Sequence, residues 1–471
     1  MALRTADEYR NGLADGRALF YRGQPVPNIN EVPSLAVAVE HAAHDFDMAA
    51  DPAFRDLAVV TDPDTGQTHS VYYKIPRDAD DLLHRMRLIE ASTAEGGTVV
   101  TLIKEIGTDA TFALLRKLQG ESRDKVQAFH DHCRDNDLAV AVAQTDVKGD
   151  RSLGPSKQAD PDLYVHVVSE NADGIVVRGA KCHTTSSANA DELIVLPTRA
   201  MGPDDADYAV AFAIPINTPG LELYVSSYSG REHNEFEFPL SSHHKLLETL
   251  TVFNDVFVPW DRVFLCREPE LAGAVALTFV EYHRFTAVSY KLPLLDAFVG
   301  ASALIAELNG VAKAGHIRDK LTHLISYSET VRALTEMAAL RAQVDDGIAY
   351  PDPMTTNMAK FTFASGYHQA LEWVQDCAGG LLVTGPGGDD WDSPTVRPVL
   401  EKYFQGAGSA EHRLRLMHVI SDLTARDLGG YHAVLAVHAE GSIEAEKMQI
   451  LRSYDSKRAL AYTKRIARIE D

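Results

Sequence analysis

The chain of 471 residues contains very little cysteine. Its four cysteines, Cys133, Cys182, Cys266 and Cys377, lie far apart, and none belongs to a C-x-x-C pair. Small secreted proteins depend on closely spaced cysteines for their disulfide frameworks. A disulfide-stabilised secreted fold is therefore not expected.

Long apolar runs are also missing. No stretch reaches about 18 consecutive apolar residues, so we expect no membrane span. The first 22 residues carry Asp7, Glu8 and Asp15 and lack the uninterrupted apolar run of a signal peptide. These features predict a cytoplasmic protein.

Acidic residues outnumber basic residues in the chain. The chain has 45 Lys and Arg against 67 Asp and Glu, which gives a formal net charge of −22. Nucleic acids and anionic bilayers are bound through clustered cations, so neither is an expected partner. With 45% hydrophobic and 24% charged residues, the composition is that of a globular protein with a large core.

Two common cofactor motifs are absent or incomplete. No G-x-G-x-x-G follows a predicted strand, so the chain has no evident nicotinamide site. His130-Asp131-His132-Cys133 resembles a metal-ligand cluster, but helical residues two apart point to different faces. We therefore predict no metal site.

The apolar periodicity divides the chain into three parts. Residues 30–135 show helical spacing, for example at 81–89 and 110–118. Short β-branched runs follow and predict strands, joined in one place by a hairpin turn at Asn171-Ala172-Asp173-Gly174. The predicted strands are 138–143, 163–168, 175–177, 193–196 and 208–212. Helical spacing returns after 272, at 292–308, 323–344, 361–377 and 412–423. The prediction is an α+β protein with domains 1–137, 138–272 and 273–471.

Two polar segments lie at the ends of predicted strands. Residues 144–152 combine hydroxyl, backbone and charged groups that suit a heteroaromatic edge and a pyrophosphate, although an exposed hairpin has the same composition. Residues 179–189 hold a thiol, an imidazole and four hydroxyls, which suits ligand contacts or a hydrated loop. In this second segment His183 is a catalytic candidate or a structural histidine, and Cys182 is expected to be a small buried side chain.

Several motifs in order resemble one enzyme family, which unites 4-hydroxyphenylacetate 3-hydroxylases with 4-hydroxybutyryl-CoA dehydratases. They are the two polar segments, residues 174–181, Val256-Phe257-Val258-Pro259-Trp260, Arg4-Thr5-Ala6-Asp7-Glu8-Tyr9 with Asp15-Gly16-Arg17, and Tyr290-Lys291-Leu292 with Phe298-Val299-Gly300. The resemblance spans nearly the whole chain. It implies an acyl-CoA dehydrogenase-like fold with an N-terminal helical domain, a middle β-barrel and a C-terminal helical bundle. It also implies FAD between barrel and bundle.

The resemblance assigns the flavin contacts residue by residue. Residues 374–380 are similar to a Gln-x-x-Gly-Gly element by which a neighbouring subunit touches the ADP half of FAD, here one residue longer; a helix C-cap is the alternative. Glu440-Gly441-Ser442 resembles a segment near the flavin, with a helix N-cap at Ser442 as the alternative. The implied cofactor-binding residues are Gln144, Thr145, Asp146, Lys148, Gly149, Asp150, Arg151, Ser152, Thr184, Thr185, Gln375, Gly379, Gly380, Glu440, Gly441 and Ser442. A flavin site shared between chains implies a homotetramer, a dimer of dimers.

The branch of the family follows from four positions. Dehydratases of this kind hold a [4Fe–4S] cluster through three Cys and one His, and the matching positions are Thr101, Glu105, His283 and Tyr290. Since only the histidine is present, we expect no iron–sulfur cluster. The hydroxylases bind and deprotonate their phenol through an Arg, a Tyr and a His. The first two correspond here to Thr108 and Phe112, and no histidine lies in the predicted strand before Gln144. The substrate is therefore expected to differ from 4-hydroxyphenylacetate.

The first hypothesis is an FADH2-dependent monooxygenase of a two-component system. A separate reductase would supply reduced flavin, which with O2 would form a C4a-hydroperoxide and hydroxylate an aromatic or heteroaromatic small molecule. His183, His283 or Glu248 would orient or deprotonate the substrate. Lys291 would face an anionic intermediate, while Tyr290 would bond substrate or flavin, or fill vacated volume. His243 and His244 are expected in a surface turn.

Two alternatives stay open. One is a cluster-free flavin-dependent dehydratase, isomerase or dehydrogenase acting on an acyl-CoA-like substrate, with Lys291, Glu248 and His283 handling proton abstraction. The other is a flavin-fold protein that has lost catalysis and serves as a scaffold.

Overall fold

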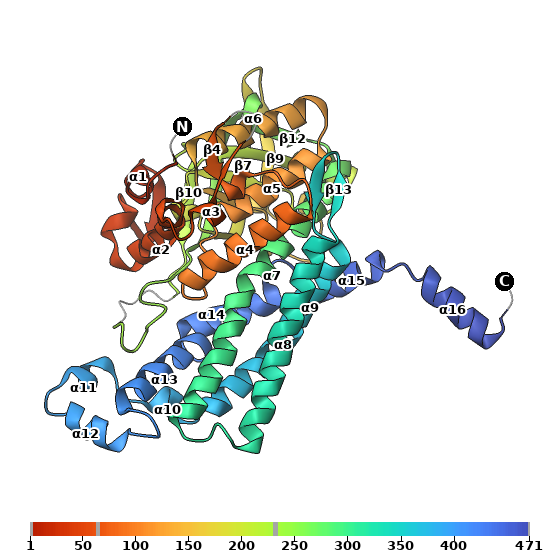
Figure 1. Cartoon of the computed structure of the whole chain (residues 1–471). Coiled ribbons are helices and arrows are strands. Elements are labelled where there is room, and N and C mark those ends of the chain that lie inside the picture. Colours follow the sequence, from red (N-terminus) through yellow and green to blue (C-terminus); the bar gives the residue numbers. More distant parts are fainter. Residues whose placement is uncertain (1–2, 63–65, 229–233, 470–471) are drawn as a thin grey trace.

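The structure is a computed structural model that describes residues 3–62, 66–228 and 234–469 (Figure 1). As predicted, the N-terminal part is mainly helical. Its helices are α1 Ala6–Gly12, α2 Pro33–Ala50, α3 Arg55–Ala58, α4 Ala79–Glu95, α5 Glu105–Lys117 and α6 Gly120–Asn136. Short strands interrupt them: β1 Ala18–Tyr21, β2 Gln24–Pro25, β3 Val59–Thr61 and β4 Thr68–Ser70.

The strands of the middle part form two open sheets. These strands are β5 Val140–Ala143, β6 His166–Glu170, β7 Gly174–Thr185, β8 Glu192–Val195, β9 Val210–Pro215, β10 Leu221–Val225, β11 Glu248–Pro259 and β12 Val263–Cys266. One sheet has the order β2-β1-β10-β11-β7-β6 and the other has the order β12-β9-β8-β5. Buried side chains of both sheets, such as Val177, Phe212 and Phe253, share one apolar core.

The implied β-barrel does not close. Within residues 3–62, 66–228 and 234–469, the two sheets meet through a single isolated bridge between Asp146 and Lys181. Strand β1 comes from the predicted N-terminal domain and pairs in parallel with β10, Ala18 opposite Glu222. The predicted hairpin turn is confirmed, because Asn171 Oδ1 accepts hydrogen bonds from the backbone N–H groups of Asp173 and Gly174.

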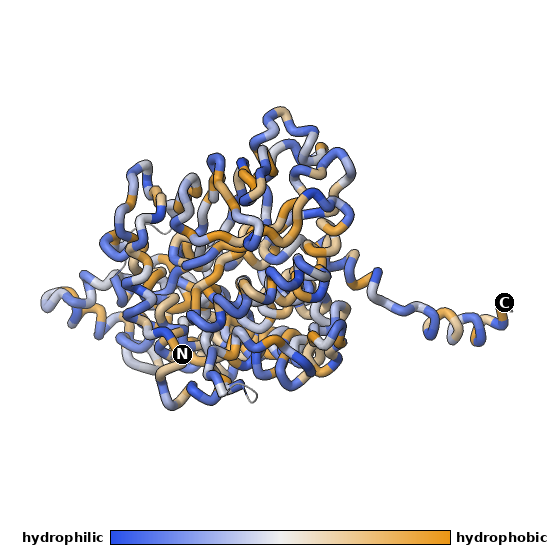
Figure 2. Tube along the Cα trace, turned by 90° about the horizontal axis from the view of Figure 1, so that it is seen from above, coloured by the Kyte–Doolittle hydropathy of each residue, from blue (hydrophilic) through white to orange (hydrophobic). Residues whose placement is uncertain are grey.

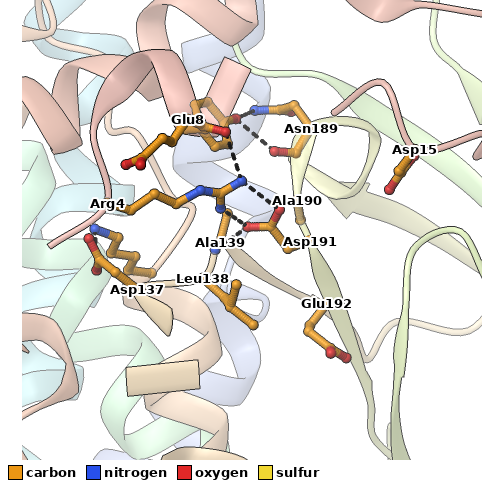
Figure 3. Close-up of polar contacts among 12 residues, drawn as sticks. Arg4, Glu8, Asp15, Asp137, Leu138, Ala139, Asn189, Ala190, Asp191 and Glu192 are labelled. Carbon is orange, nitrogen blue, oxygen red and sulfur yellow. Dashed lines mark hydrogen bonds and ion pairs between the residues drawn. The ribbon is translucent and has the colours of Figure 1, made fainter. Parts of the chain in front are cut away.

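The opening motif ties α1 to the segment that follows β7 (Figure 3). Arg4 forms an ion pair of 2.6 Å with Asp191, whose carboxylate also accepts the backbone N–H of Ala139. The Tyr9 hydroxyl donates to the carbonyl of Asn189 at 2.7 Å. Arg17 donates to two further carbonyls of the same segment, those of Ala188 and Ala190. The motif therefore fixes the chain immediately after Thr184 and Thr185.

The C-terminal part is a bundle of long helices. They are α7 Pro269–Leu308, α8 Gly315–Leu340, α9 Pro353–Ala378, α13 Ala410–Thr424, α14 Asp427–His438, α15 Ile443–Ser453 and α16 Lys457–Ala467, with the shorter α10 Leu381–Thr384, α11 Gly388–Asp392 and α12 Arg397–Tyr403. By length and composition α7 could cross a membrane, but 56% of its most apolar window is buried inside the protein. It is the central helix of the bundle.

One predicted helix is too long at its C-terminal end. The segment 323–344 leaves the helix after Leu340 and continues into a hairpin of β13 Gln343–Asp345 and β14 Ile348–Tyr350. Asp346 and Gly347 form its turn with φ values of 51° and 75°. An Asp-Gly pair favours such positive φ values and ends the helix in favour of a hairpin.

Candidate active site

Helix α7 carries three of the five predicted catalytic residues. His283 and Tyr290 are seven residues apart and lie on the same helical face, and Lys291 follows directly. Pro293 lies inside the helix and cannot donate the usual hydrogen bond to the carbonyl four residues earlier. This face therefore presents an imidazole, a phenol and an amine beside an interrupted backbone ladder.

Glu440 joins Tyr290 and Lys291 in a buried cluster. The Tyr290 hydroxyl donates to Glu440 Oε1, and Lys291 Nζ donates to Glu440 Oε2 at 3.1 Å. Lys360 of α9 lies 3.6 Å from the same carboxylate and 3.4 Å from that of Glu446. We call Tyr290, Lys291, Lys360 and Glu440 the lysine–carboxylate cluster.

The backbone around Glu440 is held in an uncommon conformation. Glu440 and Gly441 both have positive φ values, 55° and 108°. Arg284 Nε donates to the Glu440 carbonyl at 2.9 Å, and a Cβ on Gly441 would lie 2.4 Å from the Arg284 guanidinium. The φ of Gly441 favours glycine at this position. The predicted N-cap is also present, because Ser442 Oγ accepts the backbone N–H of Ala445.

Opposite charges set the protonation of this cluster. Burial raises the pKa of Glu440, but Lys291 and Lys360 outweigh it and lower that pKa to about 2. Burial lowers the pKa of Lys291 to about 8, against the opposing effect of Glu440. Glu440 is therefore a permanent anion, while Lys291 can lose its proton just above neutral pH.

His283 bonds to a carboxylate on a neighbouring buried helix. Its Nδ1 lies 3.4 Å from Asp109 Oδ2, and Phe279 stacks on its ring. Asp109 Oδ1 accepts hydrogen bonds from Arg85 at 2.8 Å and from Thr286 at 3.0 Å. A carboxylate bonded to Nδ1 leaves Nε2 as the ring nitrogen available to a ligand.

Glu248 lies where β7 and β11 meet α14. It is the register partner of Thr185, whose hydroxyl donates to it at 3.0 Å, and the Tyr431 hydroxyl donates to it at 2.6 Å. Burial raises the pKa of Glu248 to about 7, and these two hydrogen bonds offset part of the effect. After burial and Glu440, the charge of Glu248 also raises the pKa of Tyr290, so the two carboxylates act on one region.

Several groups of the first polar segment, 144–152, bond within the protein. Asp146 and Lys181 form a buried ion pair of 2.6 Å. Asp150 accepts from the backbone N–H and the hydroxyl of Ser152, at 2.9 and 2.6 Å. Gly149 has a φ of 51° and packs against Gln158. These contacts shape the loop, and they do not involve the side chains of Gln144, Thr145, Lys148 or Arg151.

The end of β7 offers an unpaired hydroxyl. Thr184 is 1% exposed, and its Oγ1 has no hydrogen-bond partner in the described chain. The preceding residue, His183, is the extra residue of a β-bulge, since Cys182 pairs with Leu250 and Thr184 with Thr249. Its φ is 57°, and partial burial together with Lys148 lowers the pKa of its imidazole. A buried orphaned hydroxyl beside a polar loop fits a bound cofactor better than an empty loop.

The predicted element at Gln375 lies far from these groups in the same chain. It ends α9, and Gly379 forms the predicted C-cap with a φ of 82°. Lys360 and Gln375 are separated by about 22 Å along that helix. The prediction assigns Gln375, Gly379 and Gly380 to the flavin site of a second chain.

The structure also shows where His243 and His244 lie. His243 is exposed as expected, but His244 is not in a surface turn: its Nδ1 lies 3.2 Å from that of His41, against α2. Burial lowers the pKa of His244 to about 3. His130 is buried and bonded to the Tyr73 carbonyl, whereas His132 is largely exposed. Across the described ranges no three His, Cys, Asp or Glu are grouped to hold a metal ion.

All four positions that match cluster ligands have protein partners. Thr101 donates to Glu105 at 2.9 Å, and Glu105 also accepts the backbone N–H of Lys104. His283 and Tyr290 bond as described above. None of the four is a thiol, and an iron–sulfur cluster requires thiolates.

Charged residues on apolar helices are the sequence signal for two site residues that were not predicted, Lys360 and Asp109. Lys360 is the one charged residue between Pro353 and Gln369, and Asp109 lies in a helix whose every residue from Glu105 to Arg116 is buried. Isolated charges on apolar helices indicate paired functional groups. Tyr431 gave no such signal.

Comparisons with known proteins match one enzyme family along nearly the whole chain. The N-terminal model of the 4-hydroxyphenylacetate 3-hydroxylase family matches residues 5–265, and the C-terminal model matches residues 272–468. The 4-hydroxybutyryl-CoA dehydratase/vinylacetyl-CoA-Delta-isomerase of Clostridium aminobutyricum is 30% identical over 98% of both chains. The 4-hydroxyphenylacetate 3-monooxygenase oxygenase component of Thermus thermophilus is 30% identical over 90% of this chain and 89% of its own length.

A solved structure of a relative has the same fold as this chain. The oxygenase component of 4-hydroxyphenylacetate 3-monooxygenase, complexed with FAD and 4-hydroxyphenylacetate, superposes with a TM-score of 0.92 at 28% identity and covers 99% of each chain. The predicted acyl-CoA dehydrogenase-like fold class is confirmed, with two open sheets in place of a closed barrel.

Proposed function

Because this chain belongs to the 4-hydroxyphenylacetate 3-hydroxylase family, we propose that it is the oxygenase component of a two-component flavin monooxygenase. It would use FADH2 from a separate reductase and hydroxylate an aromatic or heteroaromatic small molecule. The observation that carries this proposal is Glu248, a carboxyl group with a pKa of about 7 that accepts hydrogen bonds from the Thr185 and Tyr431 hydroxyls. A base of that pKa suits the deprotonation of a phenol at neutral pH.

FAD would be held by residues of β7 and the loop before it. Gln144, Thr145, Lys148, Arg151, Thr184 and Thr185 are the residues we assign to it, with Gln375, Gly379 and Gly380 supplied by a second chain of a homotetramer. When bound, the reduced flavin supplies the activation of O2. No iron–sulfur cluster is part of the proposal, and the expected location is the cytoplasm.

The residues of this chain would handle the substrate and its protons. Glu248 would accept the proton of the substrate hydroxyl, while Tyr431 and Thr185 fix the orientation of its carboxylate. The Lys291 ammonium would lie toward the negative charge that develops on the ring. His283, whose Nδ1–H is directed to Asp109, would accept a hydrogen bond from the substrate through Nε2.

The test is turnover with reduced FAD and a panel of phenols and acyl-CoA thioesters, with and without O2. The proposal predicts an oxygen-dependent product heavier by one oxygen atom from a phenol. Failure of every phenol in air, together with anaerobic conversion of an acyl-CoA, would contradict it.

A second candidate keeps the flavin and omits oxygen. The dehydratase relative and the lysine–carboxylate cluster support a cluster-free dehydratase, isomerase or dehydrogenase acting on an acyl-CoA-like substrate. Lys291 and Glu248, with pKa values of about 8 and 7, would exchange protons with the substrate carbon. Anaerobic turnover without added reductant distinguishes it from the first.

A further inference from the structure

Arg85 is a buried cation to which the proposed function gives no role. It lies on α4 and is 4% exposed. Figure 2 shows hydrophobic segments running through the interior of the body, and burying a charge among such residues costs free energy unless partners compensate it. A buried arginine therefore indicates a specific partner.

The guanidinium of Arg85 bonds mainly to α5. Its Nη2 donates to Asp109 Oδ1 at 2.8 Å, to the Thr108 hydroxyl at 2.9 Å and to the Glu105 carbonyl at 2.8 Å. Its Nη1 donates to the Tyr72 carbonyl at 3.1 Å. Of these four acceptors Asp109 carries the charge, and the two side chains form a buried ion pair.

Arg85 also lies against the two positions to which the resemblance assigns phenol contacts. It donates to Thr108, and its Cζ lies 5.5 Å from the ring centroid of Phe112. The hydrogen bonds of this guanidinium go to groups of the protein, and its charge faces Asp109. Arg85 therefore acts on a carboxylate of the chain and not on the substrate.

Asp109 connects Arg85 to His283. Its Oδ1 accepts from Arg85 and from Thr286, while its Oδ2 lies 3.4 Å from His283 Nδ1. With Asp109 ionised, the proton of a neutral imidazole stays on Nδ1, and Nε2 keeps its lone pair. The charge of Arg85 therefore decides which nitrogen of His283 can accept a hydrogen bond.

Loss of this charge would change the protonation of Nε2. A buried carboxylate without a counter-charge is neutralised by a proton. A proton on Asp109 makes the carboxyl group a donor to Nδ1, so the imidazole proton moves to Nε2. A proton on His283 instead leaves both ring nitrogens protonated. In either case Nε2 changes from a hydrogen-bond acceptor to a donor.

We propose that Arg85 is a positioning residue, which keeps His283 Nε2 unprotonated through the carboxylate of Asp109. The inference rests on the proposed function for the use of Nε2, which is to accept a hydrogen bond from the substrate. The protonation of Nε2 belongs to this chain alone, without flavin or substrate. It is therefore measured independently of turnover.

The experiment records the ring nitrogen chemical shifts of His283 by NMR at about pH 7.5, where an ordinary imidazole is mostly neutral. The protein carries 15N-labelled histidine, and the His283 signals are identified by their loss in His283→Gln. Arg85→Met and Arg85→Gln remove the charge, the second retaining a hydrogen-bond donor, while Arg85→Lys keeps it. The control Arg116→Met removes an arginine of similar burial, which pairs with Glu281 at 3.0 Å. Circular dichroism verifies that each variant is folded.

We expect Nε2 to be unprotonated in the unaltered chain, in R85K and in R116M, and protonated in R85M and R85Q. A wrongly protonated imidazole should also lower kcat/KM at least about tenfold in R85M and R85Q, with recovery in R85K.

An unprotonated Nε2 in R85M and R85Q would overturn the proposal, as would a protonated Nε2 in the unaltered chain, R85K or R116M. The expected shifts in a chain that converts no phenol would support the positioning role of Arg85 and contradict the proposed function instead.

Discussion

At the scale of single residues, two carboxyl groups of the candidate site are held in opposite protonation states. Glu440 faces two lysines and has a pKa of about 2, while Glu248 receives hydrogen bonds from uncharged hydroxyls and has a pKa of about 7. Environments that push titratable groups apart in this way assign acid and base roles. Glu440 therefore provides a fixed charge and Glu248 a proton acceptor.

The pH dependence of turnover tests this assignment. Glu248 acts as a base only when ionised, so kcat/KM should rise with pH through about 7. The Lys291 ammonium is lost as pH rises through about 8, so kcat/KM should fall above it. Glu248→Gln should remove the acidic limb and lower kcat/KM by about 100-fold or more. Lys291→Met should remove the alkaline limb instead, and an unchanged profile in either variant would contradict its role.

The stability of the lysine–carboxylate cluster depends on Lys360. Its fully buried amine lies between Glu440 and Glu446, so Lys360→Met leaves two buried carboxylates with one cation fewer. We expect a loss of about 3–5 kcal/mol in the free energy of unfolding, measured by urea denaturation. The control Lys320→Met removes a pair with the exposed Asp376 and should change the stability little. Equal losses in the two variants would show that Lys360 has no special role.

The sequence allowed some site residues to be predicted and concealed others. Tyr290 and Lys291 belong to a family motif and Glu248 was a candidate base, and the structure brings all three to one region with Glu440. Asp109 and Tyr431 come from helices far along the chain, and their roles depend on packing between distant elements. Pairing of that kind leaves no local pattern in the sequence.

At the scale of elements, β7 contains a bulge at His183. His183 occupies it with a φ of 57°, a conformation that costs a non-glycine residue roughly 1 kcal/mol. Bulges next to active sites aim side chains at ligands. The strain at His183 is therefore consistent with its predicted catalytic role.

Substituting the bulge residue separates strain from catalysis. His183→Gly should raise the free energy of unfolding by about 1 kcal/mol, because glycine adopts this φ freely. The same variant should lower kcat by about 100-fold if the imidazole transfers a proton. His183→Asn also tolerates the conformation and serves as the side-chain control. A stabilised variant with unchanged kcat would make His183 a structural residue.

The elements themselves followed closely from local patterns. Predicted strands and long helices appear where apolar spacing indicated them, and the Asn171 turn formed as its residue types require. The hairpin after Leu340 was missed because its Asp-Gly turn follows a strong helical pattern. The pairing of β1 with β10 joins residues about 200 apart, which no local window detects.

At the scale of the whole molecule, the flavin site is proposed to need two chains. Gln375 and Gly380 lie at the far end of α9 from Lys360. We consider that these residues complete the site of a neighbouring chain. A chain with Glu248→Gln then still has an unaltered Gly380 to contribute, and a chain with Gly380→Arg still has an unaltered Glu248.

Coexpression of these two variants tests the sharing of the site. Each variant alone should be inactive, and the mixed assembly should recover about a quarter to a half of the wild-type activity, because some sites then contain no altered residue. Activity is measured per flavin site on purified hetero-oligomers carrying two different tags. No recovery in a verified mixed assembly would place each site within one chain.

The central claim, that this chain inserts oxygen into an aromatic substrate, is tested most directly by isotope labelling. The purified protein is supplied with FADH2, a converted phenol and 18O2 in ordinary water, and the product is analysed by mass spectrometry. The account predicts one 18O atom in each product molecule. A product without the label, or one that also forms without oxygen, would contradict it.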